Sequence, residues 1–345
     1  MAISISDRRP VGQTGLTLPV FGFGSAHLGE LYSRVPEAVS RATLEAAWQG
    51  GVRYYDTAPW YGRGLAEHRV GGFLRTCDRS DFIVSTKVGR TLIRPADPAT
   101  FDRAPWTGGL NFDIRFDYTR DGILRSYEQA LQRLALDRID ALVVHDLDAA
   151  CHTPAALYLQ HRRDLQTSGM KALQELKAAG DIRAIGIGIN TNEAFEAVAP
   201  EVDPDFLLVA MPYTLADQDS LERGMADCLR RGISVVIGAP YASGILVTGS
   251  GSGANYAYSA ASDAVQAKIR GIEEVALAHD VAVPAAALQF VLAHPAVVSV
   301  IPGAAHPDQV RANIGHLQAE IPASFWADLK AANLIAATAP VPDHG

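Results

Sequence analysis

Three segments decide how this chain folds: IDALVVHD (139–146), SGMKALQELKAAGD (168–181) and IRAIGIGIN (182–190). The first and third segments are short runs of β-branched and other apolar residues, typical of strands that are buried on both faces. The middle segment places its apolar residues three and four positions apart and meets a glycine at its end, as an amphipathic helix does. A buried strand, a helix and a second buried strand make the unit from which parallel sheets are built.

The same alternation continues in both directions along the chain. Six further apolar runs are PVFGFGS (19–25), VRYYDT (52–57), DFIVSTKV (81–88), DFLLVAM (205–211), ISVVIGAP (233–240) and AVVSVIPG (296–303). Helical spacing recurs between them, over residues 35–51, 119–136, 218–232 and 262–280. Eight strand and helix units in about 300 residues are the number that closes a (β/α)8 barrel of the TIM type. We therefore predict an α/β fold with a single barrel domain over residues 1–345.

A doubly wound open sheet is the competing architecture. It needs a glycine-rich phosphate turn, G-x-G-x-x-G, directly after its first strand. The stretch GFGSAHLG (22–29) lacks the third glycine and the helix onset, and GIGIN (186–190) fails the same test. The barrel is therefore favoured.

Two segments break the alternation of strands and helices. Residues 88–118 follow the third strand, and residues 242–260 follow the seventh and contain GSGSG (249–253), which predicts a flexible insert. Loops of this length in a compact fold are often functional. In a barrel both would lie on the C-terminal face, where barrel enzymes have their active sites.

Composition excludes several classes of function. The 345 residues carry 30 Lys and Arg against 38 Asp and Glu, so the formal net charge is −8, which argues against a nucleic-acid partner. No apolar N-terminal region and no run of about 18 apolar residues is present, so neither secretion nor membrane crossing is expected. The three distant cysteines, Cys77, Cys151 and Cys228, form no CxxC motif and are typical of buried free thiols in a reducing compartment. We expect a cytoplasmic protein.

Four polar residues stand at or just after the ends of predicted strands: Asp56 and Tyr61 in YYDTAPWYG, Lys87 in VSTKVG and His145 in LVVHD. Each has an ordinary structural explanation, because a carboxylate can cap a turn, a lysine can reach the surface along its stem, and a histidine after a strand is often a structural group. Taken together, the four residues indicate catalysis more specifically than any one of them does alone. Asp56 can hold Lys87, whose ammonium favours the phenolate of Tyr61, and His145 can hydrogen-bond the reacting oxygen. Such a set transfers a proton for a carbonyl and alcohol couple.

The strings YYDTAPWYGRGLAE, VSTKVG, LVVHD and IPGAAHPDQVRANI (301–314) resemble the aldo-keto reductase superfamily, and the resemblance covers nearly the whole chain. It implies a (β/α)8 barrel, a nicotinamide cofactor and a catalytic tetrad on Asp56, Tyr61, Lys87 and His145. Residues 116–148, 184–190 and 235–249 are similar to the NAD-linked sugar dehydrogenases of the superfamily, the D-threo-aldose (L-fucose) and L-galactose dehydrogenases, and to pyridoxal 4-dehydrogenase.

The resemblance also bears on the choice of cofactor. NADPH-using relatives place a Lys just after the Pro of the last strand and an Arg further along, both facing the 2′-phosphate, and here these positions are Gly303 and Gln309. Charge-assisted hydrogen bonds contribute about 1.5–3 kcal/mol each, so NAD is expected and NADP is disfavoured. Arg311 is close enough in the sequence to reach a phosphate instead.

Further cofactor and substrate contacts follow from the resemblance. The usual Ser-Asn pair after the fifth strand reads Gly188-Ile189, so Asn190 is the expected contact of the nicotinamide carboxamide. The Gln of the sixth strand is Ala210, the stacking Tyr of many relatives is Gly238, and Tyr213 or Tyr241 are the candidates to replace that stacking. The other motif positions assigned to the cofactor are Ser25, Asp56, Ser243, Gly244, Leu246, Gly303, Gln309 and Asn313, and those assigned to the substrate pocket are His27, Trp60 and His145.

The expected reaction is NAD-dependent oxidation of a cyclic hemiacetal to a lactone, on an aldose such as L-fucose, L-galactose or D-arabinose, with Tyr61 as proton acceptor. The partner is then a small sugar or aldehyde, and the protein is a monomer or a homo-oligomer. The alternatives are a pyridoxal 4-dehydrogenase, a general NADPH-dependent aldehyde or ketone reductase, and a regulatory subunit that binds cofactor without turnover. No metal site is expected: His145, Asp146 and His152 lack HxH or HExxH spacing, and adjacent side chains of a strand point to opposite faces.

Overall fold

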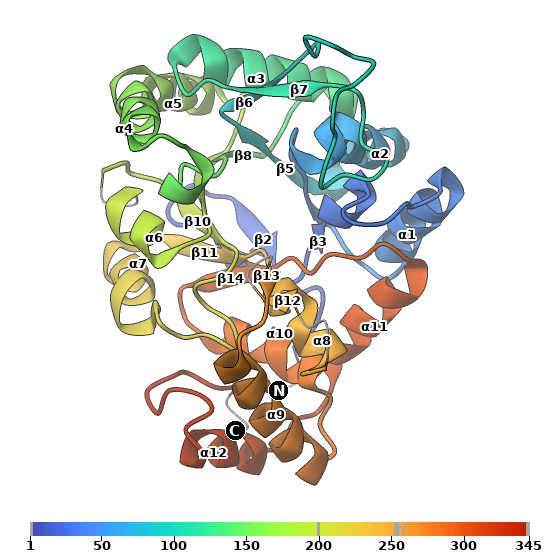
Figure 1. Cartoon of the computed structure of the whole chain (residues 1–345), viewed down its shortest axis with the longest axis vertical. Coiled ribbons are helices and arrows are strands. Elements are labelled where there is room, and N and C mark those ends of the chain that lie inside the picture. Colours follow the sequence, from blue (N-terminus) through green and yellow to red (C-terminus); the bar gives the residue numbers. More distant parts are fainter. Residues whose placement is uncertain (1–2, 199–200, 252–254, 257–258, 343–345) are drawn as a thin grey trace.

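The computed structural model describes residues 3–342 apart from 199–200, 252–254 and 257–258 (Figure 1). Its main sheet runs in the order β14-β11-β10-β9-β8-β5-β4-β3, with every neighbouring pair parallel. The strands are β3 (Phe23–Gly24), β4 (Tyr54–Asp56), β5 (Ile83–Val88), β8 (Ala141–Val144), β9 (Ala184–Ile189), β10 (Phe206–Val209), β11 (Ser234–Ile237) and β14 (Val297–Val300). Parallel bridges from Phe21 to Val300 and from Gly24 to Gly303 join the two ends. The sheet therefore closes, and the eight predicted strands and the barrel are confirmed.

The helices of the described chain lie mostly outside the barrel (Figure 1). They are α1 (Glu37–Gln49), α2 (Leu65–Leu74), α3 (Arg120–Leu134), α4 (Ala155–Asp164), α5 (Met170–Ala179), α6 (Asn192–Val198), α7 (Ala226–Arg231), α8 (Ile245–Thr248), α9 (Asp263–Ala278), α10 (Val283–Ala293), α11 (Pro307–Gln318) and α12 (Ala323–Ala331). Local sequence sets their ends: Thr119 and Ser262 cap α3 and α9 with their hydroxyls, and Gly180 ends α5 with a φ of 82°. The five helices expected from spacing are present; four have ends shifted by a few residues, and the one expected over 218–232 consists of a π-helical segment, Leu221–Met225, followed by α7.

The interior of the barrel is filled by side chains and closed at one end. An antiparallel hairpin, β1 (Arg8–Pro10) and β2 (Thr17–Pro19), precedes the barrel, and Leu18 is buried in one cluster with Val143 and Val236 of the strands. The backbone N–H of Gly12 donates to the hydroxyl of Ser234, the first residue of β11. The hairpin therefore covers the N-terminal end of the barrel, which leaves the C-terminal end for a site.

Both long segments carry structure of their own. Within 88–118, β6 (Arg90–Ile93) and β7 (Asp113–Phe116) pair as an antiparallel two-stranded sheet. Within 242–260 the structure describes α8 and a short antiparallel pair, β12 (Asn255–Tyr256) and β13 (Ser259–Ala260). In Figure 1 these last elements lie toward the viewer, over the C-terminal face. The predicted flexibility of GSGSG (249–253) falls partly on residues outside those described.

Among the described residues no single helix is long and apolar enough to cross a membrane, and α9 with α10 meets that test only as a pair bent by 102°. The three cysteines are free, as expected, but only Cys228 is buried; Cys77 is partly exposed and Cys151 is exposed. The expectation of buried thiols therefore holds for Cys228, only in part for Cys77, and is wrong for Cys151, which ends the short helical turn Ala149–Cys151.

Candidate active site

An ion pair between neighbouring strands forms the centre of the site. Lys87 of β5 places its Nζ 2.6 Å from Oδ2 of Asp56, the last residue of β4, and both side chains are 2% exposed. Nζ also donates to the carbonyl oxygen of Thr57 at 2.9 Å, and the hydroxyl of Ser85 donates to the other oxygen of Asp56 at 2.7 Å. Burial lowers the pKa of Lys87, but the charge of Asp56 and the phenol of Tyr61 raise it by more, so its ammonium persists at neutral pH.

Tyr61 lies over this ion pair. The Nζ atom of Lys87 is 4.5 Å from the centroid of the Tyr61 ring. The phenol is held there by a tight turn, because Gly62 and Gly64 adopt φ values of 63° and 99° and a Cβ on Gly62 would come within 2.7 Å of the backbone of Gly29. Glycine is required at both places.

The imidazole of His145 completes the group. His145 directly follows β8, and its ring is perpendicular to that of Tyr61, with 6.0 Å between the centroids. Burial, with Arg90 and Lys87 nearby, outweighs the opposing effect of Asp146 and holds the pKa of His145 well below its usual value. The ring is therefore neutral, and the structure brings together all four residues expected in the tetrad.

The pKa of Tyr61 moves in the direction opposite to the expected one. Burial raises it, the ammonium of Lys87 lowers it, and Asp56 and Asp146 raise it again, so the net direction is upward. The sequence hypothesis considered only the ammonium, whereas the loss of solvent around the phenol is the larger effect. Lys87 limits the rise without reversing it.

Two charged residues that the sequence hypothesis did not place in the site adjoin His145. Oδ2 of Asp146 lies 3.4 Å from Nε2 of His145 and 2.5 Å from a terminal nitrogen of Arg90, and the guanidinium of Arg90 lies 5.3 Å from the ring of Trp60. The amide nitrogen of Asn190 donates to the other carboxylate oxygen of Asp146 at 2.7 Å.

This arrangement corrects the expectation that His145 and Asp146 face opposite ways. β8 ends at Val144, and Asp146 adopts a φ of 44°, so the strand alternation no longer applies to these two residues. No group of three or more His, Cys, Asp or Glu side chains that could hold a metal ion is found in the described part of the chain.

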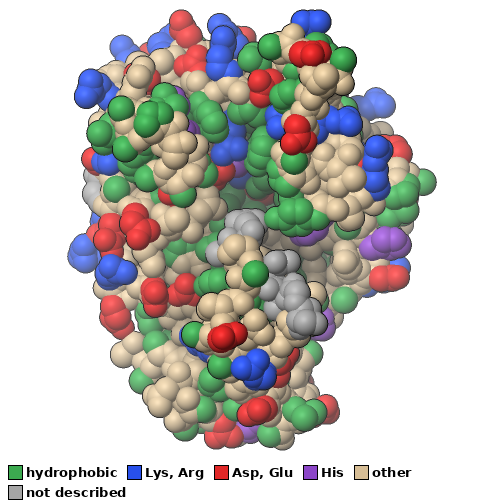
Figure 2. All heavy atoms as spheres, in the orientation of Figure 1, with side chains coloured by type: hydrophobic (Ala, Val, Ile, Leu, Met, Phe, Trp, Pro, Cys, Tyr) green, Lys and Arg blue, Asp and Glu red, His purple; other side chains and the backbone are tan. Residues whose placement is uncertain are grey.

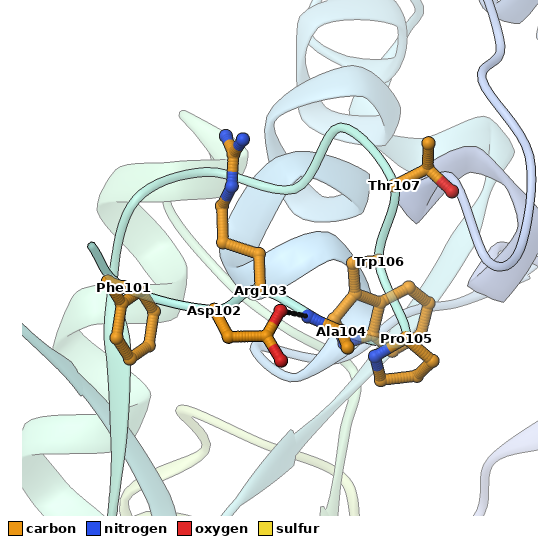
Figure 3. Close-up of a pocket in the computed structure, with 7 residues that line it drawn as sticks. All are labelled: Phe101, Asp102, Arg103, Ala104, Pro105, Trp106 and Thr107. Carbon is orange, nitrogen blue, oxygen red and sulfur yellow. Dashed lines mark hydrogen bonds between the residues drawn. The ribbon is translucent and has the colours of Figure 1, made fainter. Parts of the chain in front are cut away.

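An aromatic wall borders Tyr61. The rings of Trp60 and Trp106 meet edge to face with 5.5 Å between centroids, and Trp106 lies 6.0 Å from the ring of Tyr61. Trp106 is buried, and its indole N–H has no partner among the described residues. It belongs to residues 101–107, which line a cavity of about 310 Å³; Figure 3 shows this segment, with the carboxylate of Asp102 accepting from the N–H of Ala104.

The segment is tied to the barrel on the same side, because the N–H of Thr107 donates to the carbonyl oxygen of Glu30 at 2.9 Å. Figure 2 shows the same face as Figure 1, hollowed near its centre, with hydrophobic and basic side chains visible in the hollow. Trp106 was missed by sequence reasoning because only the folded insertion brings it next to Tyr61.

Most of the residues assigned to the cofactor follow strands on the part of the barrel that runs from β9 to β3. Asn190 follows β9, Gly238 follows β11, Gly303 follows β14 and Ser25 follows β3; β11, β14 and β3 are successive strands across the closure, and β10 separates β9 from β11. After β11, Ala242, Ser243 and Gly244 all have positive φ, and Leu246 of α8 is buried. The hydroxyl of Tyr241 donates to Oδ1 of Asn313 in α11 at 2.7 Å, which joins two of these segments.

The structure corrects one cofactor expectation. Tyr213 is fully buried, stacked on Phe290 of α10 with 5.5 Å between centroids and edge to face with His294. Its ring belongs to the packing between barrel and helices, so it is not available to stack on a nicotinamide. Tyr241 is only partly buried and stays a candidate.

Of three other residues considered for the site, two have partners of their own and the third lies against a neighbouring glycine. The carboxamide oxygen of Gln309 accepts from the N–H groups of Ala305 and His306 and so caps α11. Arg311 pairs with Asp308 at 2.5 Å on the surface. His27, assigned to the substrate pocket, lies beside Gly303, where an added Cβ would come within 2.5 Å of its Nδ1.

Comparison with known proteins shows the class of enzyme to which this protein belongs. The sequence profile of the Aldo/keto reductase family matches residues 20–334, across the closed barrel and the site described above. The protein is a barrel oxidoreductase, and the chain belongs to the aldo/keto reductase family, whose members use nicotinamide cofactors.

Several individual members of the family are similar to this chain over most of its length. The chain is 37% identical to pyridoxal 4-dehydrogenase of Microbacterium luteolum, over 97% of this chain and 100% of that protein. It is also 37% identical to D-threo-aldose 1-dehydrogenase of a Pseudomonas species, over 93% and 96%, and 28% identical to L-galactose dehydrogenase of Arabidopsis thaliana, over 89% and 86%.

Solved structures agree with the fold. An aldo-keto reductase from Bacillus halodurans, in its holo form, superposes with a TM-score of 0.70 at 25% identity and covers 98% of this chain and 99% of that one. A glycerol dehydrogenase from Gluconobacter oxydans superposes with a TM-score of 0.71 at 19% identity, covers 99% of each chain and supports the fold alone.

Proposed function

We propose that the protein is an NAD-dependent dehydrogenase that oxidises the cyclic hemiacetal of an aldose at its anomeric carbon to a lactone. The observation that carries the proposal is the contact of Lys87 with Asp56 at 2.6 Å and with the ring of Tyr61 at 4.5 Å, next to the perpendicular ring of His145. Similarity to a D-threo-aldose 1-dehydrogenase over most of both chains supports a sugar as the substrate.

The residues around the mouth fit a nicotinamide cofactor and a hydroxyl substrate. Four buried polar atoms without a partner in the described part of the chain lie near the C-terminal ends of the strands: the hydroxyls of Ser25 and Thr57, Nε of Arg90 and Nδ1 of His145. A buried polar atom without a partner is costly, so their gathering here favours a place that a polar ligand fills. Ser25, Asn190, Gly238, Ser243, Gly244, Leu246, Gly303, Gln309 and Asn313 are the residues that we propose hold the cofactor.

The nicotinamide ring, when bound, supplies the acceptor for the hydride that leaves the anomeric carbon. The phenolate oxygen of Tyr61 takes the proton of the anomeric hydroxyl, and the carbon and oxygen left behind form the carbonyl of the lactone. Lys87 stabilises the phenolate by its charge, and Asp56 holds Lys87 in place. His145 is neutral and donates a hydrogen bond to the reacting oxygen. Trp60 and Trp106 limit the access of water from the side of the insertion.

The absence of two cations supports NAD over NADP. Gly303 and Gln309 offer no positive charge to a 2′-phosphate, Gln309 is used as a helix cap, and Arg311 is engaged with Asp308. An anionic phosphate without a charged partner forgoes about 1.5–3 kcal/mol for each missing hydrogen bond.

Pyridoxal 4-dehydrogenase activity is a second candidate, favoured by 37% identity to such an enzyme over 97% of the chain. Pyridoxal also forms a cyclic hemiacetal, so the same proton transfer at Tyr61 would serve it, and the aromatic wall of Trp60 and Trp106 suits a flat ring. A general NADPH-dependent reductase is less well supported, because the cations are absent. A regulatory subunit without turnover has no need of a complete tetrad.

A panel of substrates tests the proposal. Purified protein is given NAD+ with L-fucose, L-galactose, D-arabinose or pyridoxal, and the absorbance of NADH is followed. NADPH with an aromatic aldehyde is the comparison. NADH formation with one member of the panel supports the proposal. Turnover of NADPH alone favours the reductase, and cofactor binding without any turnover favours the regulatory subunit.

A further inference from the structure

We propose that Asp146 is a positioning residue that keeps the proton of His145 on Nε2 and holds the amide of Asn190, so that one carboxylate serves both the proton-transfer group and the nicotinamide-binding side of the site. The inference rests on the proposed function for its catalytic meaning. Its structural part can be tested without turnover.

The first step concerns the two nitrogens of the His145 ring. A neutral imidazole carries one proton, and its neighbours decide which nitrogen holds it. Nδ1 is buried and has no acceptor within hydrogen-bond distance among the described residues. Nε2 faces Oδ2 of Asp146 at 3.4 Å. The proton is therefore stabilised on Nε2, where it can be shared with the oxygen of a substrate.

The second step concerns the backbone that places the carboxylate. Asp146 adopts a φ of 44°, a conformation uncommon for a residue with a Cβ. Two groups secure this bend, since Nε2 of His152 donates to the carbonyl oxygen of Asp146 at 2.9 Å and the hydroxyl of Tyr118 donates to the carbonyl oxygen of His145 at 2.7 Å. The bend turns the carboxylate toward His145, which an extended strand would not allow.

The third step concerns the charge of the carboxylate. A terminal nitrogen of Arg90 lies 2.5 Å from Oδ2 of Asp146, and the guanidinium is held between the rings of Trp60 and Phe116 at 5.3 and 4.9 Å. Burial raises the pKa of Asp146, but His145, Arg90 and Asn190 lower it by more than burial raises it, so the pKa is about 2. The carboxylate is thus ionised throughout the working range of an enzyme.

The fourth step links the carboxylate to the cofactor side. Nδ2 of Asn190 donates to Oδ1 of Asp146 at 2.7 Å, so the amide can no longer rotate freely, and its carbonyl oxygen is left as the group for a ligand. This carbonyl oxygen accepts hydrogen bonds, so it is suited to the NH2 group of the nicotinamide carboxamide. Asn190 was assigned to that group by resemblance alone, and the contact with Asp146 specifies which of its atoms is available.

The test compares Asp146→Asn with Asp148→Asn. Asp148 is a matched control, because it lies two residues away and is buried, while the side chain of Asp146 is 19% exposed, and the carboxylate of Asp148 accepts from the N–H of Ala150 and the hydroxyl of Thr191 instead of facing His145. The first readout is 15N NMR of the imidazole nitrogens in protein labelled at histidine, with the His145 signals identified by their loss in His145→Gln. We expect Nε2 to carry the proton in the wild type and in Asp148→Asn, and a shift toward Nδ1 in Asp146→Asn.

The second readout is kinetic. Asp146→Asn is expected to lower kcat about 10-fold to 100-fold, the range for a disturbed proton-transfer group, and to raise the KM for NAD+, whereas Asp148→Asn stays near the wild type. The groups that face His145 are Tyr61, Lys87 of β5, Arg90 of β6 and Asp146. Since Asp146 raises the pKa of Tyr61, its loss should also move the rising limb of the pH profile, which follows deprotonation of Tyr61, to lower pH.

Three outcomes would overturn the inference. A proton on Nδ1 in the wild type contradicts the first step and needs no variant to fold. Unchanged imidazole signals in a folded Asp146→Asn contradict the role of the carboxylate. Equal losses of kcat in Asp146→Asn and Asp148→Asn, with no change in the signals, indicate a merely structural role. Absence of turnover in the wild type would refute the proposed function and leave the NMR test standing.

Discussion

The ammonium of Lys87 and the carboxylate of Asp56 lie 2.6 Å apart at the ends of neighbouring strands, with both side chains almost completely buried. Removal of one member of a buried pair leaves the other as an uncompensated charge in the barrel. Asp56→Asn or Lys87→Met should each lower the free energy of unfolding by about 3–5 kcal/mol, and the double variant should lose less than the sum.

Denaturation in urea measures these differences. Arg41→Ala is the control, because Arg41 forms an exposed ion pair with Glu45 at 2.7 Å, and an exposed pair contributes about 1 kcal/mol or less. If Asp56→Asn were no more destabilising than Arg41→Ala, the buried charge would not be compensated in the way described.

The pH dependence of oxidation follows from the upward direction of the Tyr61 pKa. The phenol must lose its proton before it can accept one from the substrate, and its pKa lies above the ordinary value of 10.0. The initial rate with saturating NAD+ should therefore rise about 10-fold per pH unit between about pH 7 and pH 9. No second inflection is expected near pH 6.5, because the pKa of His145 lies well below that value. A flat profile through this range would contradict the role of Tyr61 as proton acceptor.

Cofactor preference should respond to charge at two positions. Gly303→Lys together with Gln309→Arg should raise the ratio of kcat/KM for NADP+ over NAD+ by at least about 10-fold, given about 1.5–3 kcal/mol for each charged hydrogen bond. The Lys side chain has to displace His27, which lies against Gly303. Gln309→Ala is the control, since it removes the helix cap without adding charge. If Gln309→Ala raised the ratio as much as the double variant, the charge argument would fail.

Trp106 should affect the substrate and leave the cofactor untouched. Trp106→Ala removes the ring that packs on Trp60 and Tyr61 and an indole N–H without a described partner. A lost hydrogen bond of about 1–3 kcal/mol corresponds to a rise in KM for sugar or pyridoxal of about 5-fold or more. Fluorescence titration with NAD+ should give an unchanged Kd. Phe112→Ala, an exposed residue of the same insertion, should leave both values alone, and an equal rise in KM there would point to a general disturbance of the loop.

The barrel could be predicted because its strands are buried on both faces and read as continuous apolar runs. The tetrad followed from the ends of those runs, since the carboxyl ends of parallel strands meet. The short pairs β1 with β2 and β6 with β7 could not be recognised in the same way, because residues such as Arg8 and Arg115 leave one face exposed and no apolar run marks the strand.

The remaining parts of the site depend on the folded chain. The left-handed backbone at Asp146 brings its carboxylate to His145, and nothing in the residue types around it announces that bend. Trp106 reaches Tyr61 only because the insertion packs on Glu30. Tyr213 illustrates the opposite error: a residue near a strand end need not face the mouth, and this one is packed against α10.

Side-by-side assays of the wild type and Tyr61→Phe, with NAD+ and the panel of aldoses and pyridoxal, test the central claim most directly. Tyr61→Phe removes one oxygen and leaves the ring over Lys87. The account predicts NADH formation by the wild type on at least one substrate, and in the variant a Kd for NAD+ within about 2-fold of the wild type, with kcat reduced by at least about 100-fold. Unchanged turnover in Tyr61→Phe would contradict the claim that the phenol of Tyr61 accepts the proton.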